Sequence, residues 1–138
     1  MKIFIDTNVL LDYLLDRKPF SAESTEVIKF CKEGSFEGFI SEHSLTDILY
    51  ITRKDFDVDI QREIIKSLCT IFTMVNISSN EIIEAVGNNG FSDLEDSIQS
   101  VCAAVCKSDY LITRNTKDFV NSEIRAISPN DFITLLKV

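Results

Sequence analysis

The chain has 138 residues, close to the roughly 150 of one domain, and its 45% hydrophobic and 26% charged residues are globular values. With only 4 Gly and 2 Pro it contains no segment of linker composition, so we expect a single domain over residues 1–138. The net charge of −8 argues against nucleic-acid binding through a broad basic surface. Any contact with nucleic acid must therefore be local, and some of the surplus carboxylates could bind a hard divalent cation.

The first apolar run ends at Asp6 and is too short for a signal peptide, and no stretch approaches the ~20 apolar residues of a membrane span. These features predict a cytoplasmic protein without a membrane segment. The four cysteines include no CxxC pair, and the single histidine, His43, has no Cys or His neighbour to complete a zinc site. The pattern argues against a zinc site and a disulfide framework.

The first half of the chain predicts strands alternating with helices. Residues 2–5 are apolar and favour a short buried strand, and an apolar helix follows until Pro19. Ser21 is the expected cap of a second helix, which Gly34 ends in the left-handed conformation. The pattern then indicates a strand at 38–40, a helix from Ser41 or Ser44 to 51, an amphipathic helix at 60–71 and a strand at 73–77.

Polar residues mark the remaining helix starts. Ser78 with Glu81, and Ser92 with Glu95, match the Ser-x-x-Glu capping box. Strands are expected at 109–113 and 126–127, and Ser128 followed by proline predicts a last helix. This alternation favours an α/β fold, a three-layer α/β/α sandwich around a mostly parallel sheet of four to five strands. Ligands of such folds bind outside the carboxyl ends of the strands, where Asp6 is expected.

Two acids stand in unusual surroundings. Asp6 directly follows a buried strand, where a carboxylate is costly to desolvate unless water, a hydrogen bond or a cation receives it. An ordinary helix cap is the alternative. Asp47 lies in the middle of an expected helix among apolar residues, although aspartate is a poor helix former. The alternative there is a solvated stripe on an amphipathic helix.

A second pair of acids opens a later helix. Asp93 and Asp96 are three residues apart, so they share a face, and the positive end of the helix stabilises both. Acids are common at helix starts for that reason alone, and Asp93 is the more cap-like of the two. The four aspartates together predict a hard-cation site, because oxygen ligands suit Mg²⁺ and Mn²⁺.

Further polar residues should lie at the same edge of the sheet. Arg114 and Lys117 are expected to contact phosphate. The residues that could position phosphate or water come at the end of the first strand or of the strand at 109–113. They are Asn8, Thr113, Arg114, Asn115, Lys117 and Asp118.

These motifs together resemble the PIN-domain nucleases, including toxins of the VapC kind. Residues 3–10, Ile-Phe-Ile-Asp-Thr-Asn-Val-Leu, are similar to the opening motif of that family. Residues 91–96 with the following Cys-Ala-Ala resemble its second acidic motif, and Thr-Arg-x-x-Lys-Asp-Phe follows a later strand. The resemblance spans nearly the whole chain.

The resemblance implies single-stranded or structured RNA as substrate, Mg²⁺ or Mn²⁺ as cofactor, a homodimer and a small antitoxin protein as partner. By position it makes Asp6 and Asp96 the principal metal ligands, with Asp93 as an additional acid. Asp47 stands where many members have glutamate, and Asn115 stands where many have aspartate. The number of metal ions in the site, one or two, is therefore left open.

We accordingly expect a metal-dependent endoribonuclease, as in the toxins of type II toxin–antitoxin pairs, with Asp6, Asp47 and Asp96 as catalytic residues. One alternative is a catalytically weak PIN-fold module that binds RNA or regulates. A metal-dependent phosphatase of the haloacid-dehalogenase type would need an acid two residues after Asp6, where Asn8 stands. A phosphate-accepting receiver would carry paired acids after its first strand, and this chain has none there.

Overall fold

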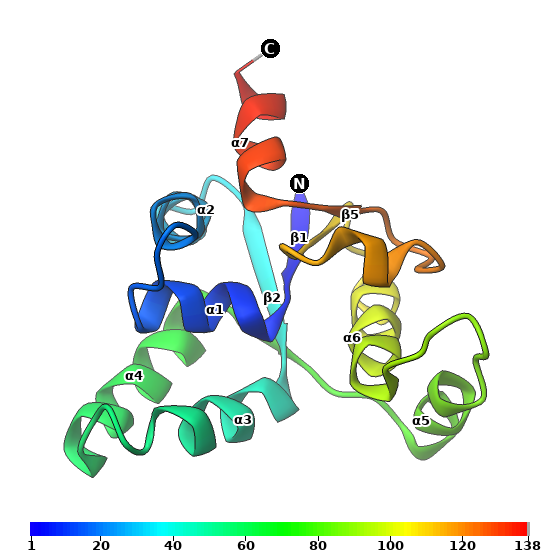
Figure 1. The fold of residues 1–138 in the computed structure, drawn as a ribbon, viewed down its shortest axis with the longest axis horizontal. Coiled ribbons are helices and arrows are strands. Elements are labelled where there is room, and N and C mark those ends of the chain that lie inside the picture. Colours follow the sequence, from blue (N-terminus) through cyan, green and yellow to red (C-terminus); the bar gives the residue numbers. More distant parts are fainter. Residues whose placement is uncertain (138) are drawn as a thin grey trace.

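The structure, a computed structural model, describes residues 1–137 and is built on a sheet of five parallel strands in the order β3-β2-β1-β4-β5 (Figure 1). The strands are β1 (Lys2–Ile5), β2 (Glu37–Ser41), β3 (Thr73–Val75), β4 (Tyr110–Ile112) and β5 (Ala126–Ile127). All five were predicted, and the sheet is fully parallel. The third strand is shorter than the expected 73–77.

α-Helices connect the first four strands in turn, and a last helix follows β5. They are α1 (Thr7–Leu14), α2 (Ser21–Lys32), α3 (Glu42–Thr52), α4 (Val58–Ile71), α5 (Ser79–Val86), α6 (Leu94–Val105) and α7 (Pro129–Leu136). A short 3₁₀ helix, η1 (Thr116–Phe119), follows β4 and was not predicted. No helix among residues 1–137 is both long and apolar enough to cross a membrane.

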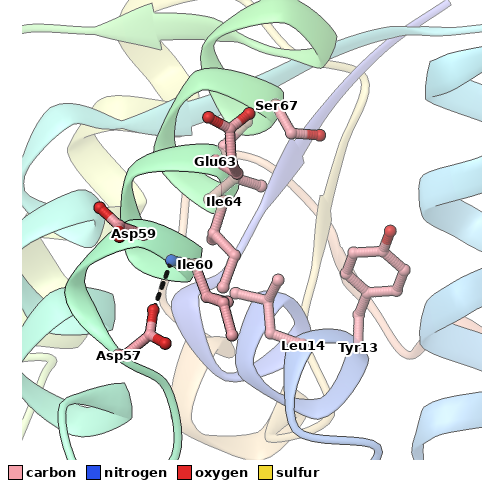
Figure 2. A pocket seen from close by; sticks show the side chains of 9 residues that line it. Tyr13, Leu14, Asp57, Asp59, Ile60, Glu63, Ile64 and Ser67 are labelled. Atoms are coloured by element: carbon pink, nitrogen blue, oxygen red, sulfur yellow. Dashed lines mark hydrogen bonds between the residues drawn. The ribbon is translucent and has the colours of Figure 1, made fainter.

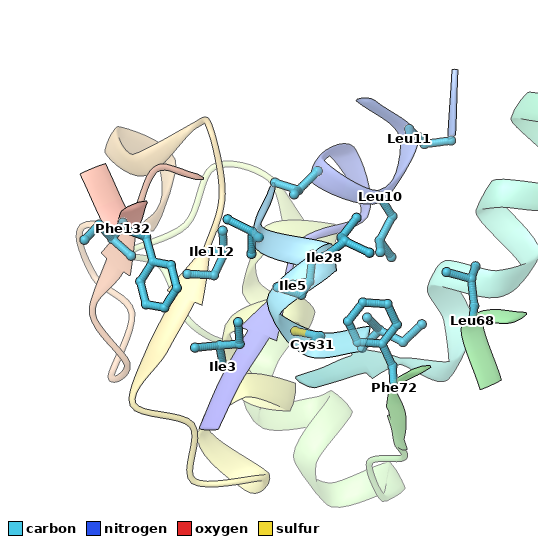
Figure 3. Close-up of a cluster of buried hydrophobic side chains, with 14 of the residues drawn as sticks. Ile3, Ile5, Leu10, Leu11, Ile28, Cys31, Leu68, Phe72, Ile112 and Phe132 are labelled. Atoms are coloured by element: carbon cyan, nitrogen blue, oxygen red, sulfur yellow. The ribbon is translucent and has the colours of Figure 1, made fainter. Parts of the chain in front are cut away.

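The sheet is covered on both faces, as the continuous apolar runs of its strands require. On one face Ile3, Ile5 and Ile112 pack against α1, α2, α4 and α7 (Figure 3). On the other face Phe4 and Leu111 pack against α6 and η1. Figure 1 shows α5 beside α6 on this second side. The predicted three-layer α/β/α sandwich is confirmed.

The helix ends confirm some predicted caps and correct two. Ser78 and Glu81 form the expected capping box, and Gly34 has the left-handed φ of 77°. The Ser92 capping box is wrong, because Asp93 is the N-cap and its carboxylate accepts hydrogen bonds from the backbone N–H groups of the next turn. The Ser21 cap is also wrong. The helix already includes Ser21, and Phe20 takes the N-cap position.

The strand order places β1 at the centre, with β2 and β4 as its two neighbours. The chain builds β2 and β3 on one side of β1 and then adds β4 and β5 on the other. Such a reversal leaves a crevice outside the carboxyl ends of the central strands, where parallel sheets bind ligands. Asp6 follows β1 and Thr113 follows β4, so both lie at this point.

Gly38 is the position in the sheet where the backbone comes closest to another side chain. A Cβ there would lie 2.7 Å and 2.8 Å from ring carbons of Phe72 and 2.9 Å from Cys31 Sγ. We expect Gly38→Ala to lower the free energy of unfolding by about 1–3 kcal/mol through overpacking. Urea denaturation would measure the loss. Adding Phe72→Leu should recover part of it, and simple additivity of the two substitutions would contradict this explanation.

Candidate active site

Asp6 is the N-cap of α1 and lies at the carboxyl end of the central strand with only 4% of its surface exposed. Its Oδ2 accepts a hydrogen bond from Thr113 Oγ1 at 2.9 Å, and its Oδ1 accepts one from Gln99 Nε2 at 3.3 Å. Burial raises the pKa of Asp6, and the hydrogen bonds from Thr113 and from the Thr7 backbone oppose that rise. The carboxylate is thus fixed in orientation.

A buried polar network lies behind Asp6. Gln99, on α6, is only 1% exposed, and its Nε2 also donates to Thr7 Oγ1 at 2.7 Å. The hydroxyls of Thr7 and Ser44 are 2.6 Å apart, and that of Ser41 lies 2.8 Å from Ser44. The network joins α1, α3 and α6, so the orientation of Asp6 depends on the packing of three helices.

Asp96 is close enough to Asp6 to be affected by its charge. Burial, followed by the charges of Asp93, Asp6 and Asp118, raises the pKa of Asp96 to about 6. Asp118, in η1, joins this group from the β4 side of β1, whereas α3 follows β2 on the other side. Asp93 carries the double role that its position suggested, because it caps α6 and also adds negative charge beside Asp96.

Asp47 belongs to a second cluster with two residues that were not predicted as site residues. Ligand atoms of His43, Asp47 and Glu95 all lie within 4.8 Å of one another. Hydrogen bonding to Asp47, then burial and the charges of Asp47, Asp93 and Asp6, raise the pKa of Glu95 to about 7. Burial lowers the pKa of His43, against the opposing charge of Asp47. Glu95 therefore connects the second cluster to Asp6.

Lysine and arginine side chains do not neutralise these acids within residues 1–137. The ion pairs there involve other acids, namely Asp12, Asp16, Glu33, Asp59 and Glu63. Asp6, Asp47, Glu95 and Asp96 thus form a region of uncompensated negative charge. Such a region is suited to a cation, which would relieve the mutual repulsion of the carboxylates.

Arg114 is engaged with a buried acid that the sequence did not single out. Asp12 is 0% exposed, and Arg114 donates to both of its oxygens, at 2.8 Å and 3.3 Å. Arg17 lies 3.6 Å from the same carboxylate, and the Arg114 guanidinium stacks 4.4 Å above the Phe20 ring. Arg114, predicted to contact phosphate, is thus held by α1.

The other residues predicted to position phosphate or water differ in their exposure to solvent. Asn8 is half-buried in the first turn of α1, and Asn115 donates its backbone N–H to Thr113 Oγ1 at 3.1 Å. Lys117 and Asp118 are exposed on η1. Lys117 is therefore the predicted phosphate-contacting cation whose side chain makes no ion pair among the described residues.

Sequence reasoning missed Glu95, Gln99 and Asp12. Glu95 was assigned to a capping box, which concealed its place one residue before Asp96. Gln99 offered a usable signal, because it is a polar residue on a buried helix one turn after Asp96 and Glu95. Asp12 offered a similar one, since it interrupts the apolar run of the first helix.

A groove of about 490 Å³ lies between α1 and α4, away from these acids. Figure 2 shows Leu14 and Tyr13 of α1 facing Ile60 and Ile64 of α4 across it. The acids at its rim are Asp57, Asp59 and Glu63. Ile60 is 47% exposed, so the groove presents apolar surface inside an acidic border.

Comparison with known proteins gives consistent matches. The PIN-domain family model matches residues 2–117. Ribonuclease VapC1 of Aquifex aeolicus (strain VF5) is 27% identical over 139 residues, covering 95% of this chain and 92% of that protein. A toxin–antitoxin complex from Klebsiella pneumoniae contains a chain with a TM-score of 0.67 and 23% identity, covering 92% of this chain and 97% of that one. VapBC2 from Rickettsia felis, bound to a promoter DNA fragment, gives a TM-score of 0.64 at 14% identity, with 93% and 98% covered.

The raised pKa values predict a pH-dependent stability of the metal-free protein. The folded state holds the Glu95 proton up to about pH 7, whereas the unfolded chain loses it near the ordinary value of 4.5. The stability that this proton brings is therefore complete below pH 4.5 and is lost as the pH rises through 7. In a chelator-treated sample, we compare the melting temperature of Glu95→Gln with that of wild type at pH 5 and at pH 8. We expect the difference to be a few degrees more in favour of the variant at pH 8.

Glu84→Gln is the matched control for this comparison, because Glu84 is an exposed acid on α5. The control should follow wild type at both pH values. A Glu95→Gln melting curve that shifts in parallel with wild type would contradict the repulsion that we assign to this cluster.

The two arginines that contact Asp12 are expected to contribute differently to the stability of the fold. Arg114→Gln removes the 2.8 Å partner of a fully buried carboxylate, and we expect it to cost about 2–3 kcal/mol of stability. Arg17→Gln removes a longer, more exposed contact and should cost less than about 1 kcal/mol. Urea titration measures both. Equal losses would show that Arg114 does not anchor α1 to the end of β4.

Proposed function

The chain belongs to the PIN-domain family, and we propose that it is a divalent-cation-dependent endoribonuclease that acts as the toxin of a toxin–antitoxin pair. The observation that carries the proposal is the buried carboxylate of Asp6. It is fixed by Thr113 and Gln99 at the carboxyl end of the central strand and shares its electrostatic field with Asp96. The 27% identical relative is named a ribonuclease, which supports RNA as the substrate.

The residues fit a hard cation. Their donor atoms are carboxylate oxygens, and the acids lack lysine or arginine partners in residues 1–137. Asp6 and Asp96 would hold Mg²⁺ or Mn²⁺, with Asp93 and Asp118 adding negative charge nearby. When bound, the cation would stabilise the charge that develops on a phosphodiester and lower the pKa of a water molecule.

The protein side chains have distinct tasks in this proposal. Thr113 and Gln99 keep both oxygens of Asp6 in a fixed direction, so little reorganisation is needed when substrate binds. Asp47 is hydrogen-bonded to Glu95, whose carboxyl group is within reach of the Asp6 charge, and we assign to Asp47 the task of receiving the proton of an attacking water. Lys117 is exposed at the same end of the sheet and can contact a phosphate of the RNA.

We also propose a protein antitoxin as partner and a homodimer as the working form. The support for an antitoxin is that two structural neighbours are described as a toxin–antitoxin complex and as VapBC2. The groove between α1 and α4 offers a suitable surface, because its apolar floor and its rim of Asp57, Asp59 and Glu63 complement an amphipathic segment with basic residues.

Substitution of the two principal acids tests the nuclease proposal. We expect Asp6→Asn and Asp96→Asn each to lower kcat/KM for Mg²⁺- or Mn²⁺-supported cleavage of a single-stranded RNA by at least about 100-fold, because each removes a charge that holds the cation. A labelled oligonucleotide resolved on a denaturing gel measures the loss. Asp6→Asn should melt no lower than wild type, because it removes a buried charge.

Asp55→Asn is the matched control, since Asp55 is an exposed aspartate beyond the end of α3. It should cleave at the wild-type rate. Undiminished cleavage by Asp6→Asn and Asp96→Asn, or wild-type cleavage that continues in excess EDTA, would overturn the proposed function.

A further inference from the structure

A pocket of about 380 Å³ lies between α1, the first turn of α2 and the first turn of α7. It shares no lining residue with the groove between α1 and α4. Its walls include the apolar side chains of Pro19, Phe20 and Pro129, and the charged side chains of Glu23 and Arg114. A cavity of this size, mostly apolar with a few convergent polar groups, is typical of a ligand-binding site.

The pocket lies at the same edge of the sheet as Asp6. Asp6 follows β1, Arg114 lies just beyond β4, and Ser128, which also lines the pocket, follows β5. These three strands are neighbours in the parallel sheet, so their carboxyl ends lie side by side. Neighbouring strands are about 4.8 Å apart, which puts β5 roughly 10 Å from β1. A single strand of RNA that crosses Asp6 can therefore place a neighbouring nucleotide in this pocket.

We propose that the pocket binds an unpaired guanine base of the RNA substrate. The inference rests on the proposed ribonuclease function for the source of the base, and it adds a sequence preference to that function. Proteins that read RNA sequence take unstacked bases from single strands, hold them against aromatic rings or guanidinium planes and bind their polar edges.

The free edge of Arg114 fits the acceptors of guanine. Its Nε and Nη2 donate to the buried Asp12, whereas its Nη1 makes no hydrogen bond among residues 1–137. Nη1 and the second hydrogen of Nη2 together form a two-donor edge. Guanine presents O6 and N7 as adjacent acceptors, and arginine is the commonest bidentate partner of this pair. Because Asp12 holds the guanidinium in place, little side-chain freedom is lost when the base binds.

Glu23 supplies acceptors for the donors of the same base. It lines the pocket with Arg114, yet its carboxylate forms no ion pair with a basic group of the described chain. An arginine and a glutamate that share a pocket without pairing leave room for a ligand that accepts on one edge and donates on another. Among the four RNA bases, guanine alone combines two adjacent acceptors with two adjacent donors, N1–H and the N2 amino group.

The rest of the pocket suits a flat ring. The Phe20 ring is 40% exposed, and the Arg114 guanidinium stacks 4.4 Å above it. Two parallel hydrogen bonds require the base to be coplanar with the guanidinium, so the base continues the layer that covers Phe20. Ser24 is fully buried, and its Oγ has no hydrogen-bond partner within residues 1–137, although buried hydroxyls normally have one. A polar base edge would supply that partner.

The charges in the pocket favour a base over a phosphate group. A phosphate would also use the free edge of Arg114, but it would then lie beside the carboxylates of Asp12 and Glu23. Like charges in a confined site repel each other strongly. An uncharged base avoids this repulsion and uses the Glu23 carboxylate as an acceptor.

Nucleoside monophosphates test the pocket without a metal ion and without cleavage. In ¹⁵N-labelled protein with EDTA, we expect GMP to shift the backbone amide resonances of Ser24 and Asn130, which line the pocket. Its Kd should be at least about tenfold lower than those of AMP, CMP and UMP. IMP, which lacks the 2-amino group, should bind at least about fivefold more weakly than GMP. Glu23→Ala should abolish the difference between GMP and IMP.

Glu26→Ala is the matched control, because Glu26 is a half-buried acid of the same helix that does not line the pocket. It should bind GMP like wild type. Equal binding of the four RNA nucleotides, or the same resonance shifts with inorganic phosphate alone, would overturn the proposal. Unchanged preference for GMP over IMP in Glu23→Ala would also overturn it.

Oligonucleotides that contain one guanine extend the test to the reaction. We expect replacement of that guanine by adenine to lower kcat/KM for cleavage by at least about tenfold in wild type and much less in Glu23→Ala. Cleavage that ignores the position of the guanine would overturn the guanine pocket and leave the ribonuclease proposal standing. If wild type cleaves no RNA, the ribonuclease proposal fails, and the selectivity for GMP still decides whether the pocket reads guanine.

Discussion

The burial of one carboxylate at the end of the central strand governs the arrangement of this molecule. Asp6 is almost inaccessible to solvent, and an isolated buried charge would cost several kcal/mol. Thr113 and Gln99 offset part of that cost, and each comes from a different element of the fold. The hydroxyl network of Thr7, Ser41 and Ser44 completes the surroundings of Gln99 and Thr7. Such buried polar groups fix the relative positions of the helices as well as that of the carboxylate.

The acids at this end of the sheet divide into two groups with different neighbours. Asp96, with Asp93 and Asp118, shares the field of Asp6, whereas Asp47 faces Glu95 and His43. Among residues 1–137, Arg114 is the basic group whose charge lowers the pKa of Asp6, and its side chain is hydrogen-bonded to the buried Asp12. The region therefore keeps its negative charge while the arginine stabilises the scaffold. This separation leaves the carboxylates at the end of the central strand available to the proposed cation.

The sequence predicted the layers of the fold more completely than the contacts of the site. Buried parallel strands are recognisable as short apolar runs, and the position of Asp6 follows from the end of the first run. The helix caps were less predictable, because Ser92 and Asp93 are neighbouring candidates and only the backbone geometry decides between them. The pairing of Asp47 with Glu95 depends on how α3 and α6 approach each other across the sheet edge. Spacing along the chain carries no information about that approach, so the two groups of acids could not be separated in advance.

The donors that hold Asp6 come late in the chain. Gln99 and Thr113 follow Asp6 by 93 and 107 residues, and β4, which pairs with β1, lies between the two in the chain. Figure 1 shows α6 and β4 in the late colours of the sequence. A chain emerging from the ribosome can form β1, β2 and β3 first, but its Asp6 then lacks both side-chain donors. Vectorial synthesis thus delays assembly of the acidic centre until α6 and β4 have been made, more than a hundred residues after Asp6 itself.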